Sequence, residues 1–153
     1  MMKKKVMIIA AAIVIVGAVV LTVAKTQSWK PRSYTVDGEG YSAQVVNGNE
    51  LILDLDANPT TGYSWAITSL PEQFSSDYDN YIQDEAEEGM DGVGGTQEYH
   101  IIALNDGTGI MTLEYKQDWD GGESDGAYEL KLEISRHKKT QLQIDSVTFE
   151  KVE

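Results

Sequence analysis

The chain has 153 residues, which suffices for one domain and a short N-terminal segment. Six of its 12 lysines and arginines and none of its acids lie in the first 32 residues, so 25 acids face only 6 bases from Ser33 onward. A domain with this net charge of −19 is repelled by phosphate backbones, which excludes nucleic acid as a partner. The lack of cysteine excludes disulfides, thiolate nucleophiles and cysteine metal sites, so the core alone must hold the fold together.

The N-terminal segment combines a basic cap, Met1 to Lys5, with an uncharged apolar run from Val6 to Ala24. The run is longer than the ~7–15 residues of a signal-peptide core and close to the roughly 20 residues that span a bilayer as a helix. We expect an uncleaved hydrophobic helix, with a signal peptide cleaved after Ala24 as the alternative. The positive-inside rule keeps the cap in the cytoplasm. Residues 1–32 therefore precede an extracytoplasmic domain, residues 33–153, that is either membrane-anchored by a single span or secreted.

Short runs of alternating apolar and polar residues follow from Tyr34 onward. In the clearest of them Leu51, Leu53 and Leu55 face one way and the intervening acids the other, which is typical of a half-buried strand. Such runs predict strands over residues 34–36, 42–46, 51–55, 63–67, 98–104, 109–115, 128–134 and 142–149. The sequence Asn105-Asp106-Gly107 predicts a hairpin between two of these strands. Short strands with turn signals every 8–12 residues, and no helix beyond the N-terminal segment, indicate an all-β fold, a β-sandwich.

The least regular stretch, residues 69–90, carries many acids and no base. We interpret it as a solvated loop. Counted from Asp77, the sixth position of an EF-hand loop, where glycine is needed, is Ile82. An acidic calcium-binding module therefore remains only as an alternative.

The first of three unusual loops is Asn58-Pro59-Thr60-Thr61-Gly62-Tyr63. We expect Asn58 to hydrogen-bond the backbone two residues on, Pro59 to fix φ, and Gly62 to supply a positive φ. The two threonines are β-branched and stiff, so they have little freedom to lose on binding. Trp65, just beyond this turn, is expected to fill the core rather than to contact a ligand.

Two further loops carry glycines or an isolated aromatic residue. Gly92-Val93-Gly94-Gly95 allows its backbone to approach another chain closely, whereas a phosphate-binding loop would need a lysine and a following helix. Trp119 follows a strand, among polar residues and glycines. This tryptophan is either an exposed binding anchor or a side chain folded over the edge of the sandwich.

Catalytic signals are weak. Gly122-Glu123-Ser124-Asp125-Gly126 matches the G-x-S-x-G pattern, but a strand rather than a helix follows it. Of the two histidines, His100 lies within a strand pattern, and His137 is followed by two lysines. Without a base, a cysteine or a cluster of metal ligands, the sequence predicts neither an enzyme nor a cofactor.

Taken together, the three loops resemble those of the chagasin family of cysteine-protease inhibitors. The family's first motif is present without change as Asn58 to Tyr63 plus Trp65, and its Gly-x-Gly-Gly loop is present as Gly92 to Gly95. The resemblance covers residues 34–135. The first motif is specific to the family, whereas the second is weak evidence by itself. The order and spacing of the motifs strengthen the resemblance.

The third family motif, Arg-Pro-Trp after a strand that ends in tyrosine, is only partly kept. Tyr115 and Trp119 are present, but Gln117 and Asp118 replace the arginine and the proline. Losing proline removes stiffness, and an acidic loop tolerates other protease surfaces than a basic one. We therefore expect binding to be kept, with altered strength and selectivity.

The resemblance implies an immunoglobulin-like β-sandwich with Greek-key topology, whose loops form a wedge for the cleft of papain-like cysteine proteases. By analogy, Thr60 would lie over the catalytic cysteine, Gly92 to Gly95 along one side of the cleft, and Trp119 on the other. The implied function is reversible, non-covalent inhibition by a monomer. The alternative is a membrane-anchored immunoglobulin-like adhesion module without inhibitory activity. The implied protease-binding residues are Asn58, Pro59, Thr60, Thr61, Gly62, Tyr63, Gly92, Val93, Gly94, Gly95 and Trp119.

Overall fold

The computed structural model describes residues 28–153, and the chain divides into two units, Met1–Lys30 and Pro31–Glu153. The hydrophobic helix expected at the N-terminus lies outside the described residues. Within residues 28–153, no helix has the length and apolar content that a membrane span needs. The described part of the second unit is all-β, with nine strands and one short 3-10 turn.

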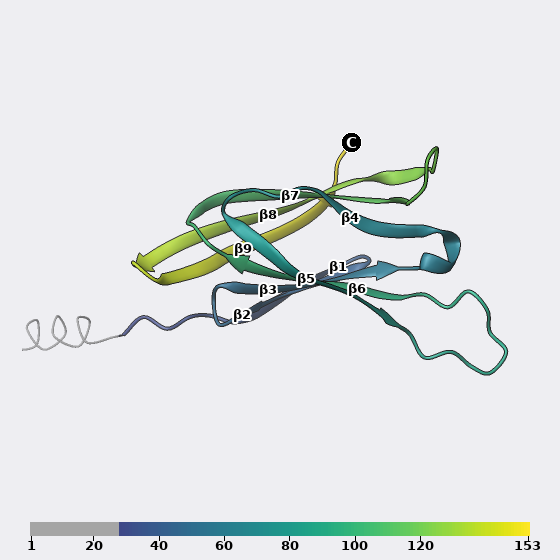
Figure 1. Ribbon diagram of the computed structural model, residues 1–153. Helices are drawn as coiled ribbons and strands as arrows, with labels where there is room; N and C mark the ends of the chain where they lie inside the picture. The colour runs from purple at the N-terminus through teal and green to yellow at the C-terminus, as the bar shows by residue number, and fades with distance from the viewer. Residues whose placement is uncertain (1–27) are drawn as a thin grey trace, which may run out of the picture. The chain divides into compact units, whose positions relative to one another are not determined.

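The strands form two antiparallel sheets, arranged as two layers (Figure 1). In chain order they are β1 (Tyr34–Gly38), β2 (Tyr41–Val46), β3 (Glu50–Ala57), β4 (Tyr63–Ser69), β5 (Phe74–Gln83), β6 (Gly95–Ala103), β7 (Gly107–Gln117), β8 (Ser124–Lys138) and β9 (Gln141–Lys151), with the 3-10 turn η1 (Pro59–Thr61) between β3 and β4. The first sheet has the order β1-β2-β3-β6-β5 and the second the order β4-β7-β8-β9. The all-β prediction is confirmed, and each of the eight expected strands is present.

The core lies between the sheets because alternate residues of each strand point inward. In β6 every second residue from Gly95 to Ala103 is buried, and Leu51, Leu53 and Leu55 of β3 have no exposed surface. Burying one such leucine contributes about 1.5–3 kcal/mol. The second sheet supplies Trp65, Met111, Leu113, Leu130, Leu132, Ile134, Ile144, Val147 and Phe149 to the same cluster.

A buried glutamine joins the two sheets, which the sequence pattern does not reveal. Gln97 of β6 is 7% exposed, and its side chain lies against the backbone of Trp65 in β4. Its Oε1 accepts from the Trp65 N–H at 3.0 Å, and its Nε2 donates to the Trp65 carbonyl at 3.1 Å. The Gln97 side chain thus pairs the backbone N–H and carbonyl of Trp65, which face away from the neighbouring strand β7. Buried polar groups need such partners.

The interpretation of residues 69–90 as an irregular loop is wrong for half of that stretch. Phe74–Gln83 is strand β5, which pairs with β6 at the edge of the first sheet. An edge strand has one free side and tolerates charged residues such as Asp77 and Asp79, so its acids hide the strand pattern. The true loop is shorter and covers residues 84–94.

The hairpin predicted at Asn105-Asp106-Gly107 is also wrong. These residues connect β6 in the first sheet to β7 in the second. Both sides of β6 are already occupied, by β3 and β5, so the chain must cross to the other layer. The backbone N–H groups of Leu104 and Asn105 donate to the carbonyl of Gln73, which fastens this crossing to the start of β5.

Candidate functional site: three loops at one end of the sandwich

The strand registers bring the three unusual loops to the same end of the domain (Figure 1). In the first sheet, Gly95 lies opposite both Ala57 and Gln83, so the loops that follow β3 and β5 start side by side. In the second sheet, Gln117 lies opposite Tyr63, so the loop after β7 starts beside the end of the first loop. The first loop crosses between the sheets and therefore stands between the other two.

The first loop is stiffened by its own side chains, as predicted. Asn58 Oδ1 accepts from the backbone N–H of Thr60 at 3.3 Å and from the Thr60 hydroxyl at 2.5 Å. The Thr61 hydroxyl donates to the Asn58 carbonyl at 2.6 Å. Gly62 ends the 3-10 turn with a φ of 85°, which is the conformation expected of a glycine there. Thr60 and Thr61 are exposed, so their methyl groups are presented at the tip with little freedom.

The base of the first loop rests on buried aromatic residues. Trp65 is 9% exposed and packs against Tyr115, with ring centroids 4.9 Å apart, which confirms its expected place in the core. Its indole N–H donates to the carbonyl of Asp56 at 2.9 Å. The Tyr115 hydroxyl accepts from the backbone N–H of Asn58 at 3.0 Å. Both ends of the turn are thereby fixed to the core.

The second loop, residues 84–94, is joined to the first by a side-chain contact. Asn58 Nδ2 donates to the Gly92 carbonyl at 3.1 Å. The loop is closed at its base, where the Asp84 N–H donates to the Gly94 carbonyl at 3.0 Å. Gly95 is buried in β6, where an added Cβ would collide with the carbonyl of Ile82. Within the predicted glycine motif, Gly92 is exposed to solvent. Gly95 instead allows the strands β5 and β6 to pack closely.

The third loop places its tryptophan on the first loop. Trp119 is 56% exposed, and an added Cβ on Gly62 would overlap its ring. The side chain is thus solvent-exposed, and its ring rests on the neighbouring loop rather than on the edge of the sandwich. The Tyr63 hydroxyl donates to Glu123 Oε2 at 3.2 Å, which gives a second link between the two loops. Partial burial, together with this hydrogen bond, raises the pKa of Tyr63 and keeps its hydroxyl a donor.

One exposed apolar residue at this end of the domain is not among the residues that the sequence predicts for the site. Met90 is 61% exposed in the second loop, two residues before Gly92. An unbranched thioether adapts to irregular surfaces, which suits a contact beside a cleft. The available signal was a single apolar side chain within an acidic and glycine-rich run.

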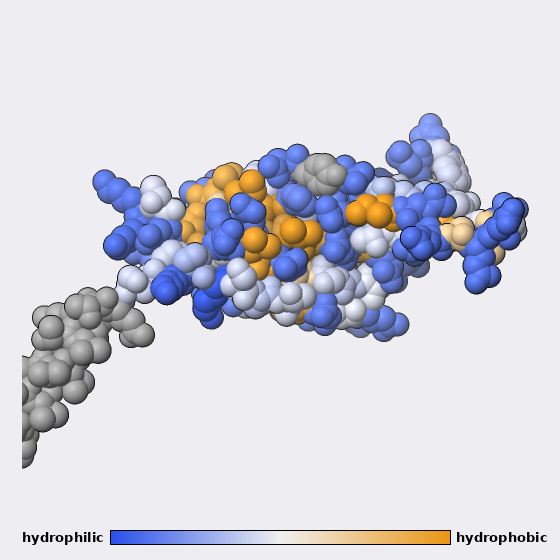
Figure 2. Space-filling model, turned by 90° about the horizontal axis from the view of Figure 1, so that it is seen from below, coloured by the Kyte–Doolittle hydropathy of each residue, from blue (hydrophilic) through white to orange (hydrophobic). Residues whose placement is uncertain are grey.

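The loop end is mostly hydrophilic, whereas larger apolar patches lie further along the face of the first sheet (Figure 2). Lys116 lies beside the loop end, and its Nζ is 3.8 Å from Oε2 of Glu114. Charge around the three loops therefore favours a partner without an acidic rim. The acids of the second and third loops are Asp84, Glu85, Glu87, Glu88, Asp91, Asp118, Asp120 and Glu123.

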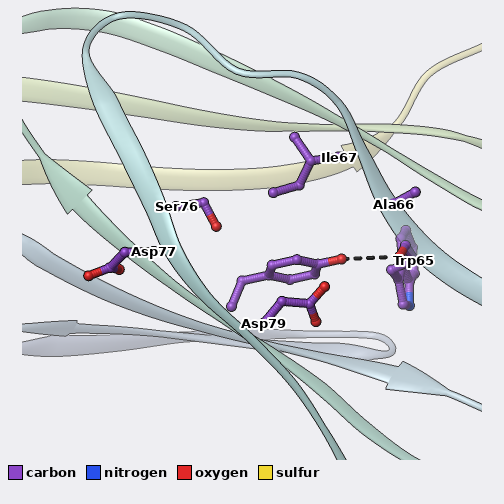
Figure 3. Close-up of a pocket in the computed structure, with 7 residues that line it drawn as sticks. Trp65, Ala66, Ile67, Ser76, Asp77 and Asp79 are labelled. Carbon is purple, nitrogen blue, oxygen red and sulfur yellow. Dashed lines mark hydrogen bonds between the residues drawn. The ribbon is translucent and has the colours of Figure 1, made fainter.

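A separate hollow lies along the side of the sandwich, between the middles of β4 and β5 (Figure 3). It has a volume of about 520 Å³ and is lined by Trp65, Ala66, Ile67, Ser76, Asp77, Asp79 and Tyr99. The Tyr99 hydroxyl donates to the Trp65 carbonyl at 3.1 Å, so the polar atoms at its floor already serve the joint between the sheets. Within residues 28–153, no group of three or more His, Cys, Asp or Glu side chains is placed to hold a metal ion.

Comparisons with known proteins identify relatives of this domain. The model of the chagasin family of peptidase inhibitors matches residues 44–134. Amoebiasin-1 of Entamoeba histolytica is 30% identical over 102 residues, which are 67% of this chain and 98% of that protein. Chagasin of Trypanosoma cruzi is 28% identical over 91 residues, which are 56% of this chain and 81% of that protein.

Among solved structures, the chain aligns with the crystal structure of a cysteine protease inhibitor from Entamoeba histolytica. The two are 32% identical, with a TM-score of 0.40, over 46% of this chain and 64% of that one. The alignment thus spans a little under two thirds of that inhibitor. The family model itself covers more than half of this chain, including all three loops. The chain belongs to the chagasin family of peptidase inhibitors.

Proposed function

We propose that this protein is a reversible, non-covalent inhibitor of papain-like cysteine proteases, whose active-site cleft it fills with the three loops. The observation that carries the proposal is the joining of these loops at one end, with Trp119 56% exposed and seated on Gly62. The relative in Entamoeba histolytica that is described as a cysteine protease inhibitor supports the same target class.

The geometry suits inhibition by shape rather than by chemistry. The first loop is a 3-10 turn fixed at both ends, so it cannot offer the extended peptide that a protease cleaves. Loops that are already ordered lose little entropy on binding, so more of the contact energy appears as affinity. An exposed indole that becomes buried is a frequent hot spot of such interfaces.

We also propose that the fold is of the immunoglobulin-like Greek-key type. Without β1 and β9, the sheets have the orders β2-β3-β6-β5 and β4-β7-β8. Lettered from A to G along the chain, these orders read A-B-E-D and C-F-G, which is the arrangement of constant-type immunoglobulin domains. The loops after B, D and F then correspond to the three loops described above.

For the cellular setting, we propose a monomeric inhibitor domain outside the cytoplasm. The apolar run from Val6 to Ala24 after three lysines supports either a single-pass anchor with the N-terminus inside or a cleaved signal. In the first case the membrane is a further partner of the chain, through this segment alone.

The test is an inhibition assay with the full chain in mild detergent, a papain-like protease and a small peptide substrate. We expect competitive inhibition, and we expect Thr60→Glu to weaken it at least about 30-fold, because a carboxylate at the tip would have to be desolvated in the cleft. Thr148→Glu, on the exposed face of β9, is the matched control and should inhibit like the wild type.

Two outcomes would contradict the proposal. The wild-type chain would fail to compete with the peptide substrate if the domain were an adhesion module. An unchanged inhibition constant in Thr60→Glu would remove the first loop from the contact surface.

A further inference from the structure

The third loop is closed at its base by a side chain that takes the place of a backbone acceptor. The Gln117 N–H donates to the Glu123 carbonyl at 2.9 Å, as in a normal strand pair. The reciprocal bond, from the Glu123 N–H, goes to Oε1 of the Gln117 side chain, also at 2.9 Å. The β7–β8 register shifts between Tyr115 and Lys116, next to this point, so regular pairing does not continue into the loop.

Above this clamp the loop makes a single tight turn. The Gly122 N–H donates to the Trp119 carbonyl at 2.9 Å, and Gly121 has a φ of 77°, which glycine adopts without strain. A Cβ on Gly122 would collide with the carbonyl and Cβ of Gln117. The turn that carries Trp119 therefore packs directly on the residue that closes the loop.

The same clamp also fixes the link to the first loop. Glu123, held through its N–H by Gln117, accepts from the Tyr63 hydroxyl at 3.2 Å. Tyr63 follows Gly62, against which the Trp119 ring lies. The backbone on both sides of Trp119 is thus held, on one side by the strand β7 and on the other by Glu123.

We propose that Gln117 is a positioning residue for the protease contact: through its hydrogen bond to the Glu123 N–H, it holds Trp119 on Gly62 and replaces the stiffness that a proline would give this loop. The proposal rests on the proposed function only for its effect on affinity, because the position of Trp119 is measurable in the free protein. It revises the expectation that a loop with Gln117 and Asp118 is a flexible one. The gain comes from pre-organisation, since the side chain of Gln117 points to its own loop.

The experiment compares two substitutions of Gln117 in the full chain in detergent micelles. Gln117→Met keeps the length of the side chain but removes the acceptor, whereas Gln117→Glu keeps an acceptor oxygen at the same reach. Gln44→Met is the matched control, because Gln44 is exposed in the middle of β2, away from the loops. Circular dichroism of all variants verifies that the sheets are intact.

The first readout is the NMR signal of the Gly62 α-protons, which the ring current of Trp119 shifts. We expect this signal to move in Gln117→Met toward its position in Trp119→Ala, and to stay in place in Gln117→Glu and Gln44→Met. The second readout is the dissociation rate of the protease complex. Losing one hydrogen bond should raise that rate roughly three- to tenfold in Gln117→Met, with rescue in Gln117→Glu.

An unmoved Gly62 signal in Gln117→Met overturns the positioning role, whatever the protease does. If the Gly62 signal moves in Gln117→Met but dissociation is no faster, the positioning role is also overturned, because the position of Trp119 on Gly62 would then be irrelevant to binding. If the wild-type chain does not inhibit at all, the proposed function fails, and the Gly62 signal alone decides whether Gln117 positions Trp119.

Discussion

Two tryptophans sit on either side of the first loop and are used in opposite ways. Trp65 is 9% exposed, its indole N–H is bonded to Asp56, and its ring contacts Tyr115 and Tyr128 at centroid distances of 4.9 and 4.8 Å. Trp119 is 56% exposed and makes its described contact with the backbone of Gly62. The buried ring contributes to the stability of the fold, whereas the apolar surface of the exposed ring remains available for a partner.

The contrast indicates that fold stability and the contact with a partner depend on different residues of this domain. The first loop lies between these two regions: Trp65 and Tyr115 fix it on the core side, and its Gly62 supports the Trp119 ring on the solvent side. Substitutions below the loop should therefore change the free energy of unfolding, and those above it should change affinity.

The largest effect is expected for Trp65→Ala. Removing a buried indole should lower the free energy of unfolding by about 3–5 kcal/mol, since it leaves a cavity and unpairs the carbonyl of Asp56. Urea denaturation followed by circular dichroism measures this change. A loss below about 1 kcal/mol would mean that the core collapses around the gap, and the division between the two tryptophans would not hold.

Trp119→Ala should have the complementary effect. We expect the inhibition constant to rise about 30-fold or more, as for other buried anchors at interfaces, and the free energy of unfolding to change by less than about 0.5 kcal/mol. The same denaturation and inhibition assays apply. Equal inhibition by the variant and the wild type would show that the exposed ring is not part of the contact surface.

Gly62→Ala should affect both properties, because this residue lies between the two regions. An alanine at a φ of 85° is strained by about 1–2 kcal/mol, and its Cβ would also displace the Trp119 ring. Gly107→Ala is the matched control: its φ is 115°, and an added Cβ there meets nothing within 4 Å. Both variants should lose stability, but only Gly62→Ala should lose affinity; a parallel loss of affinity in the control would argue for a general unfolding effect.

The smallest effect is expected at Asp54, in the middle of β3 and away from both tryptophans. Partial burial, together with Glu98 opposite it, raises the pKa of Asp54. A raised pKa in the folded state means that folding favours the protonated form, so this contribution to stability is present at low pH and is lost as the pH rises through that pKa.

Asp54→Asn should therefore make the domain more stable at neutral pH, flatten this part of the pH dependence and leave inhibition unchanged. Thermal melts between pH 3 and 8 measure it. A variant that is less stable than the wild type at neutral pH would show that the charged form of Asp54 is favourable in the fold.

The first loop was predictable from the sequence because its constraints are local. Asn58, Pro59 and Gly62 act on neighbours within three residues, so their chemistry alone predicts the turn. The strands were predictable for a similar reason, since alternation is read along one strand. β5 was missed because charged residues on an edge strand obscure that alternation.

The remaining features depend on contacts between distant residues. The seat of Trp119 on Gly62, the bond from Asn58 to Gly92 and the pairing of Gln97 with Trp65 join residues 32 to 57 positions apart. The wrong hairpin at Asp106 has the same origin, because which strands flank β6 is decided by the whole sheet. No local pattern carries this information.

In the proposed function, the three loops block a cysteine protease by shape, without a covalent step. The most direct measurement is a calorimetric titration of the full chain into a papain-like protease whose catalytic cysteine has been replaced by alanine. We expect one binding site and a dissociation constant within about threefold of that for the intact enzyme, since no bond to sulfur contributes to the complex. Binding that disappears with the cysteine would contradict it.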